Sequence, residues 1–420
     1  MADMNVTKRI YDEVHGYIGL TDVELEVINN EVFQRLRFIK QLAAAWYVYP
    51  GATHTRFSHS LGAMYLMGLI AQKLFESGYV HSTEDIQLLR LAALLHDVGH
   101  TPFSHAIESY YKNALGLDHE ELTKIIILNS SIRDVLEYYG YDPKTIVAII
   151  SGHYKEPLYN QLLSSEVDVD RMDYLIRDAL HTGVTYGIID MQRLISVIVV
   201  DDDGNLSVLD KGLDALENFY LARLHMYRAV YYHKTVVGYE HLLAKIYELL
   251  CQHFEDSLLP KSLNDIKKLV SDSDIAMWHD DWLTGYIIQK YRDQSTPELL
   301  RELIKAFLFR KGYKVLIDLS KFSDKPLSED DNDIKLLRSV EVNLKSLLND
   351  SDVSLFVDDI KIVDEDPHTM PRIIVGGKQS MPLTNIENTI ISRLPKRYHV
   401  KRLYVLSRSF DKARSLIQVP

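Results

Sequence analysis

The sequence has little cysteine, no long apolar run and no excess of positive charge. Only Cys251 among the 420 residues is a cysteine, which excludes an internal disulfide framework and a cysteine-based zinc site and fits a reducing compartment. The most apolar stretches, such as residues 61–74, are shorter than the roughly 18 consecutive apolar residues that a membrane span needs. No apolar run follows Met1, so we expect no secretory signal. These absences predict a soluble cytoplasmic protein without a membrane partner.

The charge balance is acidic, with 47 Lys and Arg against 59 Asp and Glu and a net charge of -12. Such a chain has no general electrostatic attraction for nucleic acid, so phosphate binding must come from a local basic pocket. Hydrophobic residues make up 46% of the chain and charged residues 25%, which allows a large core and argues against disorder. The length fits about three domains, or one large helical core with an appendage.

The chain divides into two textures. From about 24 to 255 apolar residues recur at helical spacing, apart from two β-rich runs around a Gly-Asn turn at about 195–209, which predict a hairpin. After about 312, short β-rich runs alternate with two polar helices near 333–348 and 384–393, and the acidic stretch 323–333 is expected to be an exposed loop. We therefore expect a mainly α protein, with a helical core at 1–255 and a C-terminal lobe, helical and then α+β, at 256–420.

Histidine and aspartate gather where buried helices begin and end. The apolar run 91–95 leads into His-Asp-Val-Gly-His at 96–100, so the last helical turn presents two imidazoles and a carboxylate together, and Gly99 permits a sharp exit. Imidazole and carboxylate are suitable ligands for zinc, iron or manganese. A single buried histidine is more often a hydrogen-bonded core residue, and an Asp-rich helix such as 168–178 is more often a solvated face. The joint pattern favours an ion site over these alternatives.

Four longer motifs carry a resemblance to a known family. They are FQRLRFIKQL at 33–42, YPGATHTRFSHSLG at 49–62, HDVGHTPFSH at 96–105 and DVDRMDYLIRD at 168–178. They are similar to the HD-domain deoxynucleoside triphosphate triphosphohydrolases, and most of all to the catalytic region of the animal SAM- and HD-domain enzymes and their prokaryotic relatives. The resemblance runs from about residue 8 into the C-terminal lobe, without a SAM domain. It implies that residues 1–255 are a catalytic HD-domain helical bundle with a small β-hairpin insertion.

The resemblance also implies a metal-dependent reaction. The metal ligands would be His59, His96, Asp97 and Asp170, holding zinc, iron, manganese or nickel, with magnesium on the nucleotide phosphates as a further expectation. A water activated by the metal would attack the α-phosphate and split a deoxynucleoside triphosphate (dNTP) into deoxynucleoside and inorganic triphosphate. His100 and His119 would lie near the reacting phosphate. His119 matches a proposed general acid or base, and its orienting carboxylate would be Glu108, where relatives carry Asp.

A further set of residues matches the family's substrate contacts. The phosphate-binding positions are Arg56, His105, Arg171 and Arg223, the rings around the deoxyribose are Tyr174 and Tyr231, and the partners of the 3′-hydroxyl are Gln41 and Asp178. A ring packed against C2′ leaves a ribose hydroxyl without a partner, which costs roughly 1 to 3 kcal/mol. Tyr232 replaces the family's Gln at the base end, so the base preference does not transfer.

Effector sites are the last feature that the resemblance implies, because the animal enzyme is a tetramer assembled by nucleotides. The matching basic or polar positions are Lys8, Gln34, Arg37, Arg193, His233, Lys234, Arg310 and Lys314. We therefore expect a homo-oligomer, dimer or tetramer, with nucleotide effectors. Asn29 stands where an Asp reads guanine and Leu209 where an Arg contacts phosphate, so activation by GTP is expected to be weakened, altered or absent.

Two other functions stay open at this point. The first is an HD phosphohydrolase for another nucleotide, such as a monophosphate or an alarmone, which would not need the set formed by Arg56, Arg171, Tyr174 and Asp178. The second is a nucleotide-sensing or assembly protein with little catalysis, against which His100 and His119 argue. Binding of single-stranded nucleic acid gains little support from a net charge of -12.

Overall fold

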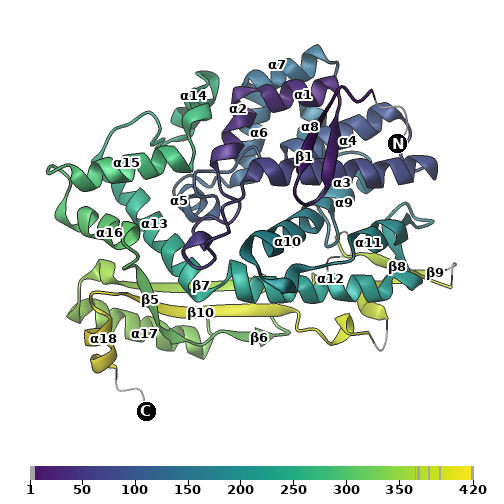
Figure 1. Cartoon of the computed structure of the whole chain (residues 1–420). Coiled ribbons are helices and arrows are strands. Elements are labelled where there is room, and N and C mark those ends of the chain that lie inside the picture. Colours follow the sequence, from purple (N-terminus) through teal and green to yellow (C-terminus); the bar gives the residue numbers. More distant parts are fainter. Residues whose placement is uncertain (1–4, 365, 367–368, 377–378, 387–388, 418–420) are drawn as a thin grey trace.

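The computed structural model describes residues 5–364, 366, 369–376, 379–386 and 389–417. Helices occupy the upper part of the molecule in Figure 1, and the long strands of one sheet run beneath them. The largest apolar core includes buried residues of the helices and of the upper side of that sheet. None of the described helices combines the length and the apolar character needed to cross a bilayer.

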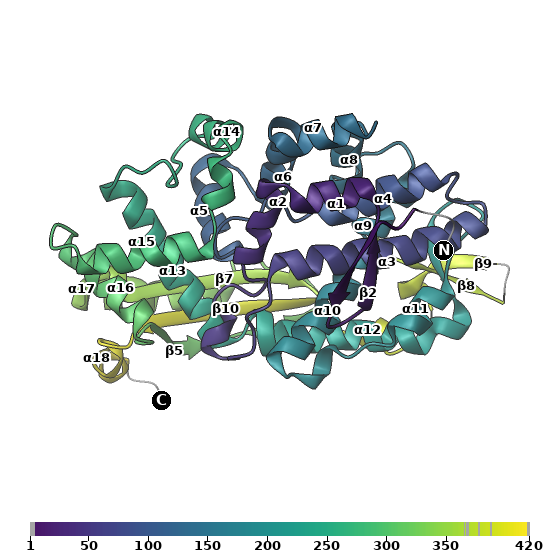
Figure 2. The ribbon, with the colours of Figure 1, turned by 45° about the horizontal axis from the view of Figure 1, so that its top comes forward.

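Most of the helices come from the first three quarters of the chain. They are α1 (Asp22–Asn29), α2 (Glu31–Gln34), α3 (Arg56–Glu76), α4 (Thr83–Leu95), α5 (His105–Leu115), α6 (His119–Asn129), α7 (Ser131–Tyr138), α8 (Pro143–Ile150), α9 (Pro157–Leu163), α10 (Val169–Thr182), α11 (Met191–Val197), α12 (Leu213–Met226), α13 (Lys234–His253), α14 (Leu263–Ser271), α15 (Asp280–Arg292) and α16 (Glu298–Leu308). Side-chain caps set several starts: Ser82 accepts from the backbone of α4, Asp118 from α6 and Asp168 from α10. The three helices α3, α4 and α10 pack together at the centre (Figure 2).

Shorter helical turns connect these elements. They are η1 (Arg35–Phe38), η2 (Ala45–Tyr47), η3 (Thr185–Gly187), η4 (Asp210–Gly212), η6 (Asp274–Met277), η7 (Asp350–Asp352), η8 (Leu383–Asn385) and η9 (Ile391–Arg393), together with the π-helical turn η5 (Tyr227–Tyr231). The π-helical turn joins α12 to α13. Such turns are uncommon and frequent at functional sites.

Two small β structures flank the helices. An antiparallel pair of β1 (Lys8–Asp12) and β2 (Gly16–Leu20) begins the described chain, and the sequence pattern did not predict it. The expected hairpin is confirmed as β3 (Ile198–Val200) and β4 (Leu206–Leu209), but it starts at 198 because α11 extends to Val197. Strand β4 also pairs in parallel with β8 (Arg372–Val375), which pairs with β9 (Gln379–Pro382), so the hairpin belongs to a four-stranded sheet.

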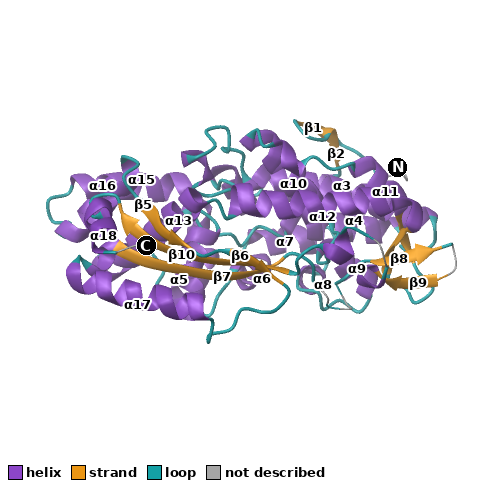
Figure 3. Ribbon diagram, turned by 90° about the horizontal axis from the view of Figure 1, so that it is seen from below, coloured by secondary structure: helices purple, strands orange, loops and turns teal. Residues whose placement is uncertain are grey.

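The C-terminal lobe is built around β10 (Arg397–Leu406). This strand pairs antiparallel with β5 (Tyr313–Asp318), β6 (Lys321–Ser323) and β7 (Val353–Lys361). Its side chains alternate between two faces: Leu403 and Val405 join the core under α17 (Asn332–Leu347), whereas Tyr404 and Leu406 join the main core. Figure 3 shows α17 against these strands, and α18 (Phe410–Leu416) ends the described chain.

These observations confirm the mainly α class with an α+β C-terminal lobe, and the polar helix expected near 333–348 is α17. The helix expected near 384–393 is wrong. Residues 383–385 and 391–393 form only single turns, and 387–388 lie outside the described residues. Thr and Asn side chains there favour turns because they bond the local backbone, as Thr389 does with the Ser392 N–H at 3.0 Å.

The acidic stretch 323–333 is partly fixed by a buried cation. Lys401 on β10 is fully buried, and its Nζ lies 3.0 Å from Asp331 Oδ1 and 2.5 Å from Asp333 Oδ2. The expected exposed loop therefore covers residues 324–330, whereas Asp331 caps α17. The division of the chain near residue 255 stays a prediction.

Candidate active site

The four predicted metal ligands meet where α3, α4 and α10 converge. His59 lies in the first turn of α3, His96 and Asp97 directly follow α4, and Asp170 lies in the first turn of α10. His59 Nε2 is 3.0 Å from Asp170 Oδ1, 3.3 Å from His96 Nε2 and 3.6 Å from Asp97 Oδ2. His96 Nε2 is 3.4 Å from Asp97 Oδ1. Residues far apart in the sequence thus direct two nitrogens and two carboxylates at one point.

The orientation of the two imidazoles fits a bound cation. His96 Nδ1 lies 2.7 Å from the Ala93 carbonyl, which can only accept, and His59 Nδ1 lies 2.8 Å from the Asp173 carboxylate. Both imidazoles therefore carry an N–H at Nδ1 and turn Nε2 toward each other. Burial lowers the pKa of His59, but bonds to Asp170 and Asp173 outweigh it and raise the pKa to about 10, so without a metal a proton occupies Nε2 as well. A divalent transition metal suits this donor set and would replace that proton.

A buried outer shell holds His59 in place, and the sequence analysis missed it. Asp173 Oδ1 lies 2.6 Å from His15 Nε2, and Arg177 donates to Asp173 Oδ2 at 2.8 Å. A side chain at Gly62 would put its Cβ 1.9 Å from Asp173 Oδ1, so α3 can approach α10 only with glycine there. The sequence signal was the spacing of Asp173 three residues after Asp170, which puts both carboxylates on one helix face. His15, in the β1–β2 turn, gave no signal.

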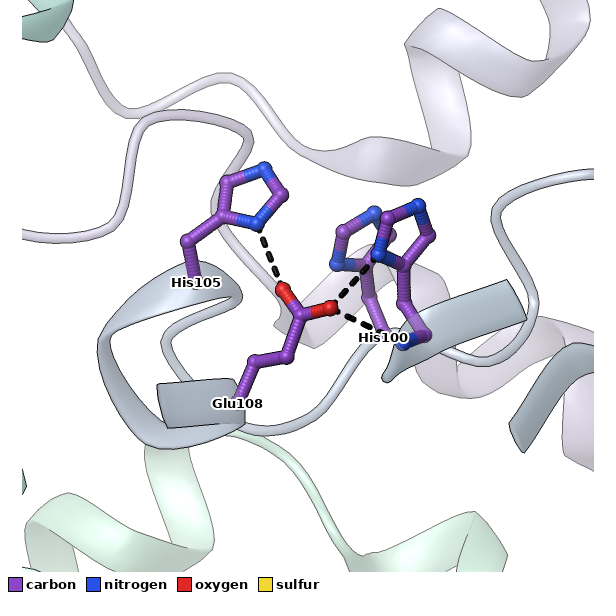
Figure 4. A group of neighbouring side chains, drawn as sticks. His100, His105 and Glu108 are labelled. Atoms are coloured by element: carbon purple, nitrogen blue, oxygen red, sulfur yellow. Dashed lines mark hydrogen bonds and ion pairs between the residues drawn. The ribbon is translucent and has the colours of Figure 1, made fainter. Parts of the chain in front are cut away.

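A second cluster lies beside the first and centres on Glu108 (Figure 4). In Figure 4 the Glu108 carboxylate points toward His105 and toward the ring that stands beside His100. Glu108 Oε2 is 2.6 Å from His105 Nδ1, and Oε1 is 2.7 Å from His119 Nδ1. The His119 ring stacks on His100 at 4.4 Å, and His100 Nε2 lies 3.2 Å from Asp97 Oδ1. The longer Glu arm thus reaches His119 as the predicted orienting carboxylate.

The charges in this cluster divide between the two stacked imidazoles. Burial raises the pKa of Glu108, but hydrogen bonds from His105 and His119 outweigh it and hold the pKa far below its usual range. Burial lowers the pKa of His119, but Glu108 raises it overall. The pKa of His100 is held well below its usual value by burial and by Arg56. These shifts favour the protonated form of His119 and the neutral form of His100.

One cavity of about 880 Å³ joins both clusters to the predicted substrate residues. Its wall includes Asp97, His100, His119 and Asp170, together with the predicted substrate residues Gln41, Arg56, His105, Arg171, Tyr174, Asp178 and Tyr231. Arg223 does not line it: the guanidinium is buried and donates to Glu166 Oε2 at 2.6 Å. The phosphate-binding role of Arg223 stays a prediction, and in the structure its guanidinium is paired with Glu166.

The cationic groups of the wall are anchored by acids but keep donors free. Arg56 donates from Nη1 to Asp97 Oδ2 at 2.5 Å and from Nε to Ser104 Oγ at 2.8 Å. Arg171 donates to Asp168 Oδ2 at 2.5 Å, and a quarter of its side chain stays exposed. The His105 side chain is 65% exposed. A guanidinium carries five donors, so both arginines can also bind a phosphate.

The aromatic part of the cavity wall lies around the carboxylate of Asp178, which is hydrogen-bonded to neighbouring side chains. The rings of Tyr174 and Tyr231 meet edge to face at 5.8 Å. Asp178 accepts from Tyr231 Oη at 2.8 Å, and its other oxygen lies 2.7 Å from His54 Nε2. The buried Gln41 Oε1 has no hydrogen-bond partner in the described part of the chain. This set can recognise a sugar hydroxyl; His54 is the partner that the sequence analysis missed.

Tyr227 is a residue of the cavity wall that the sequence analysis missed. It lies in the π-helical turn, four residues after Arg223 and four before Tyr231. Burial raises its pKa, but the nearby Arg223 and Arg171 outweigh this and lower it overall. The Tyr227 hydroxyl therefore lies near the guanidinium groups of Arg223 and Arg171.

The predicted effector residues come from several separate elements of the structure. Their positions are Lys8 in β1, Gln34 at the end of α2, Arg37 in η1, Arg193 in α11, His233 and Lys234 at the start of α13, Arg310 after α16 and Lys314 in β5. All eight residues lie in the described part of the chain. The only side-chain hydrogen bond between two of them joins Arg37 Nε to Gln34 Oε1, at 2.7 Å. Their effector role and the oligomer stay predictions.

Comparison with known families gives two adjoining matches. The HD domain matches residues 56–178, and the HD associated region matches residues 189–335. The first match contains all four predicted metal ligands and begins and ends at residues of the cavity wall, Arg56 and Asp178.

Several curated proteins are similar over long stretches. The uncharacterized protein MJ1154 of Methanocaldococcus jannaschii is 37% identical over 64% of this chain, which spans 54% of that relative's length. The uncharacterized protein YwfO of Bacillus subtilis is 33% identical over 72% of this chain and 70% of its own. The deoxynucleoside triphosphate triphosphohydrolase SAMHD1 homolog of Dictyostelium discoideum is 28% identical over 98% of this chain and 79% of its own.

A solved structure extends the similarity to the whole fold. A phosphohydrolase from Bacteroides thetaiotaomicron superposes with a TM-score of 0.76 at 28% identity, covering 95% of this chain and 99% of that one.

The outer shell leads to a prediction about metal binding. Asp173→Asn removes the negative charge that orients His59 and faces His15, so the affinity for Mn²⁺ or Zn²⁺ should fall by about 10-fold to 100-fold. The measurement is the dissociation constant of the metal, by competition with a chelator. Asp202→Asn, at an exposed position of the β3–β4 turn, is the control and should leave the affinity unchanged. Equal metal affinity in the two variants would show that the charge of Asp173 does not support metal binding.

Proposed function

We propose, from the premise that the chain belongs to the HD-domain family, that it hydrolyses dNTPs to deoxynucleoside and inorganic triphosphate in a metal-dependent reaction. The observation that carries the proposal is the single cavity whose wall joins the ion site, the His100–His119 pair, two arginines and the Tyr174–Tyr231 pair. The name of the Dictyostelium relative, a deoxynucleoside triphosphate triphosphohydrolase, supports it.

His59, His96, Asp97 and Asp170 would hold the metal. A divalent transition ion bound there supplies Lewis-acid polarisation of a phosphoryl oxygen and a lowered pKa for water. Zinc, iron, manganese and nickel all suit the donor set, and magnesium on the nucleotide phosphates is part of the proposal. Asp97 is held in place by Arg56 at 2.5 Å, so the ion site and the phosphate-binding guanidinium are linked directly.

The protein's own groups provide the remaining chemistry. Arg56, Arg171 and His105 neutralise the triphosphate, which the net-acidic chain would otherwise repel. Attack at the α-phosphorus breaks its bond to the 5′-oxygen, which must gain a proton to leave as an alcohol. His119 is placed to give that proton, because Glu108 holds its Nδ1–H and favours the charged ring.

The sugar end would select deoxyribose by shape and by hydrogen bonding. Asp178 and Gln41 offer acceptors to the 3′-hydroxyl, while the rings of Tyr174 and Tyr231 close the space that a 2′-hydroxyl would need. An HD phosphohydrolase for monophosphates would not need this set. A nucleotide sensor without catalysis would not need the buried Glu108–His119 pair, so hydrolysis remains the better proposal.

The reaction itself is the first test. Protein loaded with Mn²⁺ and given each dNTP should release inorganic triphosphate, not phosphate or pyrophosphate, by anion-exchange chromatography. His96→Ala should lose bound metal and at least about 100-fold of activity together, since it removes a ligand. His153→Ala, an exposed histidine after α8, is the control and should behave as wild type. Release of monophosphate from another nucleotide would favour the alternative substrate class.

Sugar discrimination is the second test. Tyr174→Ala opens the space beside C2′, so the ratio of kcat/KM between dGTP and GTP should fall by about tenfold or more while metal content stays constant. Tyr186→Ala removes a ring that is 55% exposed and does not line the cavity, so it should leave the ratio unchanged. An unchanged ratio in Tyr174→Ala would remove this ring from the proposal.

The pH profile is the third test. Ionised Glu108 favours the charged form of His119 and so raises its pKa; Glu108→Gln removes that charge, and the pKa of His119 falls. If His119 must be protonated, activity is lost as pH rises through this pKa, so the descending limb of kcat/KM should move to lower pH in Glu108→Gln. Glu121→Gln, in the first turn of α6 with its side chain exposed, is the control. A limb that stays in place would assign the proton to another group.

A further inference from the structure

One wall of the cavity comes from elements outside the ion site, namely α13 and β7. Val237, Glu240, His241 and Ala244 recur on α13 at the spacing of one helix face, and all four line the cavity. Phe356 and Asp358, two residues apart on β7, line it as well. His241 of α13 contacts Phe356 and Ser354 of β7, so a helix face and a strand meet at this wall. Figures 1 and 2 show α13 reaching the sheet that contains β7.

The aromatic side chains of this wall are held by contacts with one another and with β7. His241 meets Phe356 edge to face at 4.9 Å, and His241 Nδ1 lies 3.2 Å from Ser354 Oγ. Tyr232 donates its hydroxyl to Asp358 Oδ2 at 2.9 Å, and its ring lies 6.4 Å from Phe356. These rings provide an apolar surface that suits a heterocyclic base.

Glu240 differs from its neighbours because its carboxyl group has no protein partner. No hydrogen bond or ion pair joins it to any side chain or backbone group of the described residues, and it lines the cavity. Burial raises its pKa to about 8. An unpaired acid in a partly desolvated wall is unfavourable unless a ligand provides its hydrogen bonds.

We infer that Glu240, which lies in one wall with Tyr232, His241 and Phe356, reads the hydrogen-bonding edge of the substrate's base. This inference rests on the proposed function, because it assigns the remaining wall of the same cavity to the remaining part of a nucleotide. The Tyr174–Tyr231 pair is next to it, since Tyr231 and Tyr232 are consecutive.

The chemistry of a carboxyl group sets the expected preference. Adenine, guanine and cytosine present an amino N–H on that edge, which a carboxyl oxygen accepts whether or not the group is ionised. Thymine presents a ring N–H between two carbonyl oxygens, and an ionised carboxylate that accepts from this N–H brings its second oxygen against a carbonyl. The group is ionised above its pKa of about 8. At pH 9 the wild-type protein should therefore use dATP, dGTP and dCTP better than dTTP, and the comparison below is made at that pH.

The experiment compares four-base selectivity in matched variants of the full, metal-loaded chain. The ratio of kcat/KM between dATP and dTTP should favour dATP by about tenfold in wild type. Glu240→Gln adds an amide donor that can bond the thymine carbonyl, so the ratio should fall toward one. Glu240→Ala should lower it by losing turnover of dATP. Glu248→Gln makes the same change two turns along α13, where Glu248 pairs with Lys245 at 2.9 Å and does not line the cavity, and should keep the wild-type ratio.

A base-free probe separates base reading from damage to the site. Inorganic tripolyphosphate has no base, so its dissociation constant, by calorimetry with Mn²⁺ present, should be equal in wild type and in both Glu240 variants. dNTP turnover with the same four-base ratio in wild type and both variants overturns the inference and leaves the proposed function standing. Weakened tripolyphosphate binding in both variants overturns it too, because Glu240 then supports the phosphate end. A wild-type protein that hydrolyses no dNTP with any metal overturns the proposed function and the inference together.

Discussion

The structure depends on two imidazoles whose ε nitrogens are turned toward each other in a buried, acidic space. His59 and His96 come from different helices, and each is fixed by a bond at its other nitrogen, to Asp173 and to the Ala93 carbonyl. Two Nε2 lone pairs would repel at 3.3 Å, so a proton or a metal ion must neutralise at least one of them. The two carboxylates of Asp97 and Asp170 supply the balancing negative charge. The meeting of α3, α4 and α10 is therefore suited to a bound cation, and the cavity extends from it.

Asp97 links the predicted metal ligands to the neighbouring histidine cluster. One carboxylate faces both ligand imidazoles, accepts from Arg56 and lies within 3.2 Å of His100. His100 in turn stacks on His119, whose orientation comes from Glu108. The close approach that this chain of contacts needs explains Gly99: a Cβ there would lie 2.2 Å from the backbone of α6, at His119 O and Thr123 N. The glycine is thus required for helix packing rather than for a turn.

The sequence was most informative where a motif is local. The run 96–100 predicted a helix end that presents His96 and Asp97, and α4 does end at Leu95. It was least informative where a contact joins distant segments. His15 reaches Asp173 across 158 residues of sequence, and no periodicity marks it. The helix expected near 384–393 is not formed, because side chains such as Thr389 bond the local backbone and stabilise turns. The hairpin at 198–209 was predicted, but its parallel pairing with β8 was not, because Ser207 pairs with Arg372, 165 residues later.

The amino-acid sequence by itself determined the class of fold, the motif residues and the chemistry that imidazole, carboxylate and guanidinium groups can perform, because these follow from local spacing and from side-chain type. Only the tertiary structure decided which of the many histidines and acids face one another. It turned His59 and His96 nitrogen to nitrogen and buried Arg223 beside Glu166. It also left the Glu240 carboxyl group on the cavity wall without a partner among the described residues. The physical reason is that burial and pairing depend on how helices pack, and packing brings together side chains that the linear chain keeps apart.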